Sequence, residues 1–441
     1  MKRTFLDALW PALLALFLYL PSVGDATVWD DHEFFQNENR IVNMSVRQAF
    51  TTDFWGSTAH PAVNQAGVDH ISHYRPLALL AYSGVFRIFG EDPEAVHLTD
   101  VVLNALATFA FVYLLAGLGF DRKVYLTAAF LFAVHPIHVE AVAWMTGMTD
   151  TLAAAALLAS LAFYVRGQNL LAATLAAIAM LMKESAIVAP ALIILIEWRR
   201  EPRFKRAFGA AAPYAALAAA YLVARALAIP SLRPGLTQTL FLTRYHLMPA
   251  IAGRYVAELF VPWPLAFCYD VHSRMMPALG FGIVALWVFV VQQAKSMRDD
   301  LLFAGGIAAI CLAVPILASP LAIRLDVAVQ DRYAYLASAG VCLLLAVVLR
   351  RIRRWVIVAI LLIASFATLK QQQVWQSEEA LWTHALKVTP SSSLASYELA
   401  LKLVSLGRSS EALAVCQEGS RYHPEEKTIQ DCFAAARQGK N

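Results

Sequence analysis

The segment MKRTFLDALWPALLALFLYLPSVG (residues 1–24) decides the fold, because it places two basic residues before an apolar run long enough to cross a bilayer. Lys2 and Arg3 are expected to hold this end in the cytoplasm. The run has the pattern of a signal peptide, but no A-x-A-like cleavage site follows it, and VGDAT is a poor substitute. We therefore interpret the segment as a signal anchor and first membrane span.

The composition of the whole chain supports the same fold class. Hydrophobic residues make up 59% of the 441 residues and charged residues only 15%, whereas soluble domains carry about 25% charged residues. The apolar segments lack the alternation of barrel strands, so the sequence predicts an all-α, polytopic membrane protein. The net charge of +4 says little about partners, because the basic residues serve topology, and no nucleic-acid partner is expected.

Basic clusters divide the chain between apolar segments. The positive-inside rule places all five clusters in the cytoplasm. Between neighbouring cytoplasmic clusters the chain must cross the membrane, turn outside and return. Counting these crossings predicts eleven membrane spans and a C-terminus on the outside. The clusters are Arg122 with Lys123, Arg166, RREPRFKR (199–206), Lys295 with Arg298, and RRIRR (350–354).

The predicted spans belong to one transmembrane domain, residues 1–370. Its first outside loop covers about 24–95, where RPLALLAYSGVFRIFG (75–90) is expected to lie on the membrane surface. Counting that segment as a span would move Arg122 to the outside. The expected spans are about 4–22, 96–118, 124–137, 150–165, a hairpin over 170–198, 207–229, 276–293, 301–318, 333–349 and 355–370.

The hairpin is unusual because it must enter and leave the membrane on about 28 residues. Lys183 and Glu184 lie at its tip. Two short or re-entrant half-helices suit this length better than two full spans. Irregular backbone at membrane depth usually lines a cavity.

The C-terminal tail, residues 371–441, is polar and has a helical pattern. Pro390 and Pro424 are thirty-four positions apart, and the tripeptide EAL recurs at 379–381 and 411–413. This period predicts tetratricopeptide-like helical hairpins. About one and a half repeats are present where such arrays usually need three, so the tail is expected to lean on the membrane domain or to be a remnant.

An acidic stretch, VWDDHEFF (28–35), follows the first span directly. Asp30 and Asp31 are either the start of a solvated loop or a functional pair. Aromatic neighbours at the interface would partly desolvate the carboxylates and raise their pKa toward that of a useful base, and a pair could divide the work of base and orienting group. The neighbours are Trp29, Phe34 and Phe35.

The other outward-facing polar clusters gather on the same predicted side of the membrane. Whatever chemistry the protein performs is therefore expected at its outer face. The clusters are TTDFWG (51–56), HYRPL (73–77), HPIHVEAVAWMTGMTD (135–150), MKES (182–185), TRYH (243–246) and RLDVAVQDRYAYL (324–336).

Three cations, Arg75, Lys183 and Arg332, lie within these clusters. Cations at a membrane edge often only snorkel, which suits Arg87 or Arg225. Arg332 sits in a polar run at the start of a span, where a guanidinium can hold a phosphate bidentately. Together with the carboxylates, these cations suit a reaction that releases a phosphate within the membrane.

The stretch HPIHVEAVAW offers His135, His138 and Glu140. Their spacing superficially resembles a metal set, but Pro136 breaks the helical register, so a polar cluster for a head group or sugar is favoured. A divalent metal is possible but not predicted. Asp150 is either the N-cap of the next helix or a site residue.

The five cysteines contain no CxxC pair and give no metal or disulfide framework. Cys268, Cys311 and Cys342 are expected to be small apolar packing residues. Cys416 and Cys432 can pair if their compartment is oxidising.

Taken together and in order, several segments resemble the transmembrane and tetratricopeptide-repeat O-mannosyltransferase family and its bacterial relatives, within the glycosyltransferase C superfamily. The resemblance covers most of residues 20–200 and the 325–340 region and is thin across 207–320. The motifs are VWDDHEFFQNENRIV, DFWG, HYRPL, LFAVHPIHVEAVAWMTGMTDTLAA, LMKESAIVAPALIILIE and DRYAYLASAG.

The resemblance implies an inverting transferase that takes a sugar from a polyprenyl-phosphate carrier on the lumenal or periplasmic face. It places the catalytic base at Asp30 or Asp31, and the carrier phosphate at Arg332. In the mechanism that we expect, Lys183 or Arg75 assists Arg332. Here the family's ERYLYLPS-like motif reads DRYAYLAS, which keeps the arginine. The residues expected to bind substrate are His135, His138, Glu140, Asp150, Glu184, Tyr74 and Tyr333.

The implied partners are the donor lipid, membrane lipids and a protein acceptor, with no required cofactor, in a bacterial inner membrane whose periplasmic side carries the site. A lipid or lipid-linked glycan is an alternative acceptor. A transporter would instead need ionisable residues along a path through the bilayer, which spans such as AALLASLAFYV lack. A non-catalytic scaffold would leave the acidic loop unexplained.

Overall fold

The computed structural model describes residues 2–32, 38–55, 73–90, 92–229, 234–322 and 327–438. Helices dominate this part of the chain, and the assigned elements there include no strand. The prediction of an all-α protein is confirmed. Glu33, Phe34 and Phe35, which were part of the predicted acidic stretch, lie outside the described residues.

Eight helical segments within the described ranges are long and apolar enough to cross a membrane. Each overlaps a predicted span. They are α1 (Lys2–Tyr19) with η1 (Leu20–Gly24), α7 (Pro93–Gly117), η3 (Met145–Gly147) with α10 (Met148–Tyr164), α13 (Phe204–Ala228), α16 (Met275–Gln293), η6 (Lys295–Met297) with α17 (Arg298–Ala318) and η7 (Ser319–Leu321), η9 (Asp331–Ala334) with α18 (Tyr335–Leu349), and α19 (Arg354–Trp375).

A ninth candidate span is bent. Helix α8 (Arg122–Ala133) is followed by η2 (Pro136–His138) and α9 (Val139–Ala143), and the two parts meet at 47°. Pro136 begins the second part, where a missing backbone N–H costs no helical hydrogen bond. The predicted break in helical register at Pro136 is therefore confirmed.

The predicted short hairpin is built from α11 (Asn169–Met182), η4 (Glu184–Val188) and α12 (Ala189–Arg200). The 14 residues of α11 span only about 21 Å at 1.5 Å per residue, less than the roughly 30 Å hydrocarbon core. Lys183 and Glu184 lie at the break, as expected. The total of eleven crossings stays a prediction.

The remaining helices lie before, between and after the spans. Helix α6 corresponds to the segment predicted for the membrane surface and packs on α3, α4, α7 and α11. The bounds are α3 (Glu38–Val42), α4 (Val46–Thr51), α6 (Pro76–Phe89), α14 (Pro234–Arg244), η5 (Tyr245–Leu247), α15 (Met248–Phe260), α20 (Glu378–Val388), α21 (Ser393–Ser405), α22 (Ser409–Ser420) and α23 (Lys427–Gln438).

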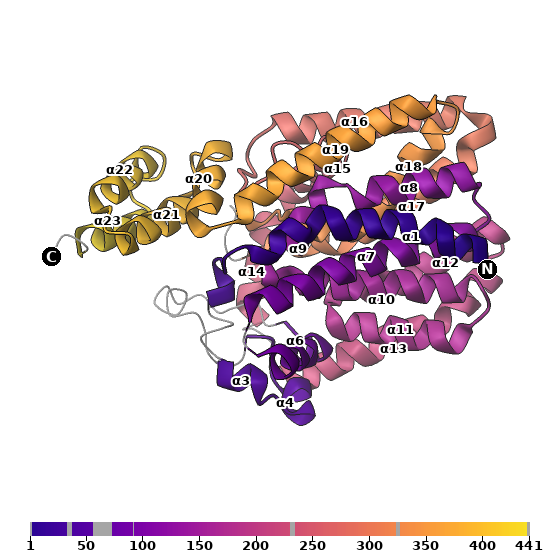
Figure 1. Cartoon of the computed structure of the whole chain (residues 1–441), viewed down its shortest axis with the longest axis horizontal. Coiled ribbons are helices and arrows are strands. Elements are labelled where there is room, and N and C mark those ends of the chain that lie inside the picture. Colours follow the sequence, from indigo (N-terminus) through magenta and orange to yellow (C-terminus); the bar gives the residue numbers. More distant parts are fainter. Residues whose placement is uncertain are drawn as a thin grey trace.

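Predicted cytoplasmic clusters meet at one end of the helical bundle. The Lys123 ammonium donates to the carbonyl oxygens of Arg350 and Ile352 at 2.7 and 2.9 Å, and Arg199 pairs with Asp300 at 2.8 Å. Figure 1 shows the N-terminus at this end and the α20–α23 tail at the other. The arrangement agrees with the positive-inside expectation.

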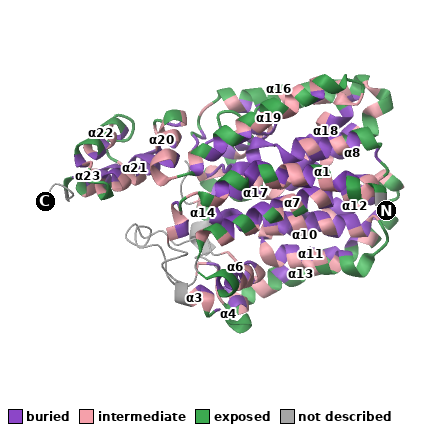
Figure 2. Ribbon diagram, viewed as in Figure 1, coloured by how far each residue is buried: buried purple, intermediate pink, exposed green. Residues whose placement is uncertain are grey.

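The outside of the bundle is apolar. Figure 2 shows buried residues along its central helices and many exposed ones on α16 and α19. Large hydrophobic side chains are exposed there, as on a surface that faces lipid rather than water. They include Leu286, Phe289, Leu362, Ile363 and Phe366. The chain is an integral membrane protein.

The tail consists of four helices in which α20 packs on α21, α21 on α22, and α23 on both α21 and α22. Gly407, with φ 74°, follows α21 in a left-handed conformation that suits glycine. Cys416 and Cys432 form a disulfide between α22 and α23, while Cys268, Cys311 and Cys342 are free and buried, as predicted. The tetratricopeptide assignment stays a prediction.

Candidate active site

One seven-residue segment, WMTGMTD (144–150), organises the site. It runs through η3 into the first turn of α10. A Cβ on Gly147 would lie 2.7 Å from the carbonyl oxygen of Ala141 and 3.0 Å from that of Glu140, closer than atoms can approach without displacement. Glycine is therefore required for this segment to pack against α9.

The segment fixes Asp31, which is 1% exposed. Thr146 donates its backbone N–H and its hydroxyl to Asp31 Oδ1 at 3.1 and 2.8 Å. The backbone N–H of Val28 donates to Oδ2 at 3.1 Å. Burial raises the pKa of Asp31 to about 6, although these hydrogen bonds and the neighbouring His32 oppose the rise. Asp30, beside it, is half-buried.

Arg332 is held by a carboxylate and two aromatic rings. Its guanidinium donates to Glu140 and lies 4.4 Å from the ring centroid of Trp144 and 4.8 Å from that of Tyr333. The other oxygen of Glu140 accepts the backbone N–H of Asp331 at 2.8 Å. Glu140 therefore fixes both the side chain and the backbone at the start of α18, and Arg332 is oriented rather than snorkelling.

Lys183 pairs with Asp150 at 2.5 Å, although both side chains are buried. The Lys183 ammonium also lies 5.0 Å from the Tyr333 centroid, and Asp150 is 3.9 Å from the Arg332 guanidinium. The N-cap of α10 is Gly147, so the alternative that Asp150 only caps the helix is wrong. Asp150 instead joins two of the predicted phosphate-binding cations.

Arg75 forms a two-point ion pair with Glu184, at 2.9 Å through Nε and 2.6 Å through Nη2. His73 Nδ1 lies 3.1 Å from the same carboxylate. Arg75 also donates to the hydroxyl of Thr149 at 3.4 Å. The hairpin tip and the segment before α6 are thereby tied to the start of α10.

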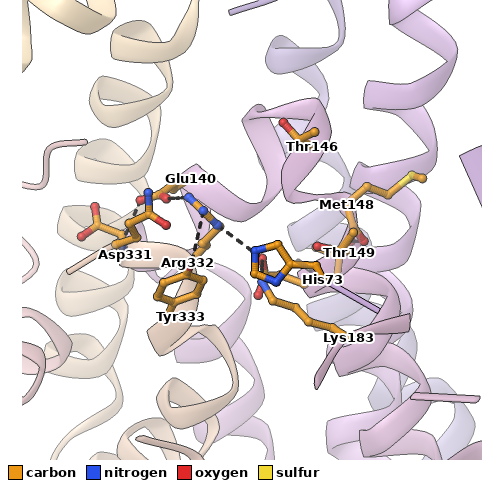
Figure 3. Close-up of polar contacts among 12 residues, drawn as sticks. His73, Glu140, Thr146, Met148, Thr149, Lys183, Asp331, Arg332 and Tyr333 are labelled. Carbon is orange, nitrogen blue, oxygen red and sulfur yellow. Dashed lines mark hydrogen bonds and ion pairs between the residues drawn. The ribbon is translucent and has the colours of Figure 1, made fainter. Parts of the chain in front are cut away.

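These residues form one cluster. Figure 3 shows Glu140, Arg332 and Tyr333 facing His73, Thr149 and Lys183 across the space between the helices. We call it the ion-pair cluster; its charged members are Arg75, Lys183, Arg332, Glu140, Asp150 and Glu184. The carboxylates balance the cations, which lowers the cost of burying them.

Three predicted substrate-binding residues have their described partners elsewhere. His135 Nε2 lies 3.0 Å from the carbonyl oxygen of Leu259, and His138 Nε2 lies 2.7 Å from the hydroxyl of Ser338. Tyr74 donates to the carbonyl oxygen of Phe50 at 3.3 Å. All three side chains are buried, so the structure gives them packing contacts and leaves their role in binding a prediction.

Thr146, Trp144 and His73 occur in the motifs quoted above, but nothing in the sequence marked them as site residues. A hydroxyl or an aromatic ring has no spacing rule that marks it as a partner of a distant residue. Asp31 and Thr146 are 115 positions apart. Only the packing of the first loop on η3 shows that they meet.

Another missed feature is a polar stripe inside α7. His97, Asp100, Asn104 and Thr108 are fully buried in this span. Asp100 accepts the hydroxyl of Thr151 on α10, and Asn104 accepts the hydroxyl of Tyr335 on α18 at 2.6 Å. Such hydrogen bonds between helices hold membrane bundles together. The four polar residues are three or four positions apart, which places them on one helix face, and this spacing could have revealed them in the sequence.

Metal ligands do not gather in the ranges that the structure describes. No group of three or more His, Cys, Asp or Glu side chains there is arranged to hold an ion. The acidic side chains of the cluster face cations instead, as the pairs of Glu140 and Asp150 show.

Comparison with known proteins finds similarity to protein mannosyltransferases. Residues 73–233 match the model described as dolichyl-phosphate-mannose-protein mannosyltransferase. Protein O-mannosyl-transferase F38B6.6 of Caenorhabditis elegans is 24% identical over 435 residues, 90% of this chain and 60% of the relative. Protein O-mannosyl-transferase TMTC1 of Homo sapiens is 24% identical over 452 residues, 85% of this chain and 50% of the relative.

The chain thus spans between half and three fifths of the length of these curated relatives. A crystal structure of ArnT from Cupriavidus metallidurans bound to undecaprenyl phosphate aligns over 98% of this chain and 77% of that chain, with 14% identity and a TM-score of 0.42. The family model and the sequence relatives confirm the resemblance that the motifs predicted.

Proposed function

We propose that this chain, a relative of the transmembrane and tetratricopeptide-repeat O-mannosyltransferases, is a membrane glycosyltransferase that moves a sugar from a polyprenyl-phosphate carrier to a protein hydroxyl. One observation carries the proposal. A single segment, residues 144–150, contacts both Asp31 of the acidic pair and the three cations of the ion-pair cluster. The acidic pair and the cations proposed to bind the phosphate therefore contact one short segment.

The acidic pair would supply the base. An acceptor hydroxyl has a pKa far above 7, so a carboxylate must take its proton as the oxygen attacks the anomeric carbon. Asp30 is the first choice because it is less buried than Asp31. Hydrogen bonds from Val28 and Thr146 hold Asp31 in place. In this division of work, Asp31 holds the loop and Asp30 faces the acceptor.

The cations would stabilise the leaving phosphate. As the sugar–oxygen bond breaks, negative charge grows on the carrier phosphate, and fixed cations in a site of low dielectric constant stabilise it strongly. Arg332, Lys183 and Arg75 each pair with a carboxylate, so the phosphate would compete with those carboxylates for the cations. One direct displacement inverts the anomeric centre, and the proposed reaction requires no metal.

The proposed setting is a bacterial inner membrane with the site on the periplasmic face. The basic clusters at the opposite end of the bundle support this orientation. A lipid or lipid-linked glycan is the alternative acceptor, because the acidic pair can deprotonate a hydroxyl of either class.

The α7 stripe is the observation that favours the second candidate, a transporter. Asp100 and Asn104 place polar groups inside a span, contrary to the expectation that span interiors are apolar. Their hydrogen bonds to α10 and α18 are those of interhelical contacts, so the transferase remains the better-supported proposal.

Radiolabelled polyprenyl-phosphate sugars test the proposal. Purified protein in detergent is incubated with a panel of donors and an acceptor peptide, and donor consumption is measured. Consumption of one donor, with release of the free carrier phosphate, is expected. If every donor remains intact while the protein binds the carrier lipid, the chain is not a transferase for these donors.

A further inference from the structure

The loop that carries the acidic pair is held by the tail as well as by the membrane domain. Trp29 directly precedes Asp30 and has φ 47°, a strained conformation for a bulky residue that persists only when surrounding contacts enforce it. The contacts around Trp29 therefore determine how the next residues, Asp30 and Asp31, are presented.

Aromatic rings from three separate parts of the chain surround Trp29. The centroid of Phe267 lies 4.7 Å away, that of Trp144 5.8 Å and that of Trp382 6.2 Å. Trp382 belongs to α20 of the tail and is 1% exposed. Trp144 also lies beneath Arg332. The same set of rings thus connects the tail, the acidic loop and the phosphate-binding arginine.

Polar contacts join the tail to the same loop. His32 Nε2 lies 2.9 Å from Glu378 Oε1 in α20, and Lys402 of α21 lies 3.2 Å from the other oxygen of Glu378. The backbone N–H of Ala26 donates to the carbonyl oxygen of Gln376 at 3.4 Å. Hydrogen bonding to Glu378 raises the pKa of His32, which favours the charged form of this pair.

The tail also docks on the loop between α15 and α16. His384 Nε2 lies 2.9 Å from the carbonyl oxygen of Leu265, and Thr389 donates to that of Cys268 at 2.8 Å. These two carbonyls flank Phe267, which packs against Trp29 and Trp382. The first tail helix is therefore fixed to both loops that surround Trp29.

We propose that the tail is part of the catalytic unit, and that Trp382 and Glu378 are positioning residues that hold the acidic pair in place through Trp29 and His32. The inference rests on the proposed function, because it assumes that this pair supplies the base. It differs from a recognition role, in which the tail would bind the acceptor and act mainly on KM.

The variants Trp382→Leu and Glu378→Gln test it in the full-length protein, with hydrogen exchange of residues 25–32 and steady-state transfer as readouts. A displacement of about 1 Å can cost 100-fold in rate, so Trp382→Leu should lower kcat by about 10- to 100-fold with little change in acceptor KM. Glu378→Gln should lower kcat by about 2- to 5-fold, since ion pairs that are only partly buried contribute little. Both should speed exchange of the loop.

Two further variants control for general damage to the tail. Trp382→Phe keeps an aromatic ring against Trp29 and should restore most of kcat. Arg421→Gln breaks the exposed pair with Glu418 on the same tail and should leave exchange and kcat unchanged.

The outcomes separate the two proposals. Unchanged loop exchange in both Trp382→Leu and Glu378→Gln overturns the inference, whatever the activity. Faster exchange with unchanged kcat, or a rise in acceptor KM alone, also overturns it while the transferase assignment stands. If the wild-type protein transfers no sugar from any donor, the proposed function fails, and the claim that the tail positions catalytic groups fails with it.

Discussion

At the scale of single residues, Thr146 helps to keep Asp31 ionised against the effect of burial. Its side chain and backbone both donate to Oδ1, and hydrogen bonds to a carboxylate favour the ionised form. Burial raises this pKa to about 6 even with these hydrogen bonds in place, so Asp31 is ionised at neutral pH.

The variant Thr146→Val removes the hydroxyl donor and keeps the shape of the side chain. The pKa of Asp31 should rise further. Because ionised Asp31 holds the loop that presents the proposed base Asp30, the acid limb of kcat/KM should move to higher pH, by about one unit for a charge-assisted hydrogen bond. A pH–rate profile measures the shift. Thr146→Ser retains the hydroxyl and should restore the wild-type profile; an unshifted limb in Thr146→Val would show that Asp31 does not govern it.

Arg332 and Glu140 are best tested together, because removing one partner leaves the other charge buried and costs about 3–5 kcal/mol. Arg332→Gln alone should lower the unfolding midpoint in detergent. The double variant Arg332→Gln with Glu140→Gln should recover most of that loss yet remain at least 100-fold slower in transfer. A double variant that folds and transfers at the wild-type rate would exclude Arg332 as the phosphate-stabilising group.

The residues that sequence reasoning found are those whose charge is unusual in an apolar chain. Lys183, Glu184 and Arg332 were visible for this reason, and the structure places them in one cluster. His135 and His138 were visible too, but their described contacts are with the helical core. The composition shows that a polar residue in an apolar chain needs a hydrogen-bond or ion-pair partner. It does not show which residue that partner is.

At the scale of elements, the turn η3 fixes how α9, α10 and the acidic loop fit together. Gly147 allows it to pack within van der Waals contact of the backbone of α9. Because Thr146 and Asp150 lie on either side of this glycine, a shift of the turn would displace both proposed halves of the site.

The variant Gly147→Ala should therefore lower kcat by at least 10-fold, since a Cβ there would lie 2.7 Å from the carbonyl oxygen of Ala141. Gly84→Ala is the matched control, because a Cβ at Gly84 in α6 meets nothing within 4 Å and alanine favours the helix. The measurement is the sugar-transfer rate of each variant, compared with that of the wild-type protein. Equal rates would show that η3 does not set the geometry of the site.

The helical spans were largely predictable, because long apolar runs mark each span and basic clusters mark where spans end. The bend at Pro136 and the short hairpin around Lys183 followed from proline chemistry and from length. The η3 turn could not be predicted, since MTGMT contains no apolar period. Its shape results from contact with α9.

At the scale of the whole molecule, the account requires opposite ends of the bundle to face opposite sides of the membrane. The native cysteines make this testable, because Cys268, Cys311 and Cys342 are buried and Cys416 is paired with Cys432. A single added surface cysteine would then be the accessible thiol.

Gln168→Cys, beside the predicted cytoplasmic Arg166, and Ser405→Cys, in α21, are exposed positions at the two ends. A membrane-impermeant maleimide should label Ser405→Cys in intact cells and label Gln168→Cys only after permeabilisation. Labelling of both before permeabilisation would contradict the predicted topology.

The docking of the tail was the large-scale feature that the sequence could only suggest. Fewer than two repeats predicted that the tail either leans on the membrane domain or is a remnant. The contacts of Trp382 and Glu378 with the first loop depend on surfaces that become neighbours only after folding.

The central claim is that the acidic pair supplies the base for transfer from a polyprenyl-phosphate sugar. The most direct measurement compares the wild-type protein with the double variant Asp30→Asn and Asp31→Asn, following both transfer and binding of the carrier lipid. Binding should be retained while transfer falls by about 100- to 10,000-fold. Wild-type transfer by a folded double variant would contradict the claim.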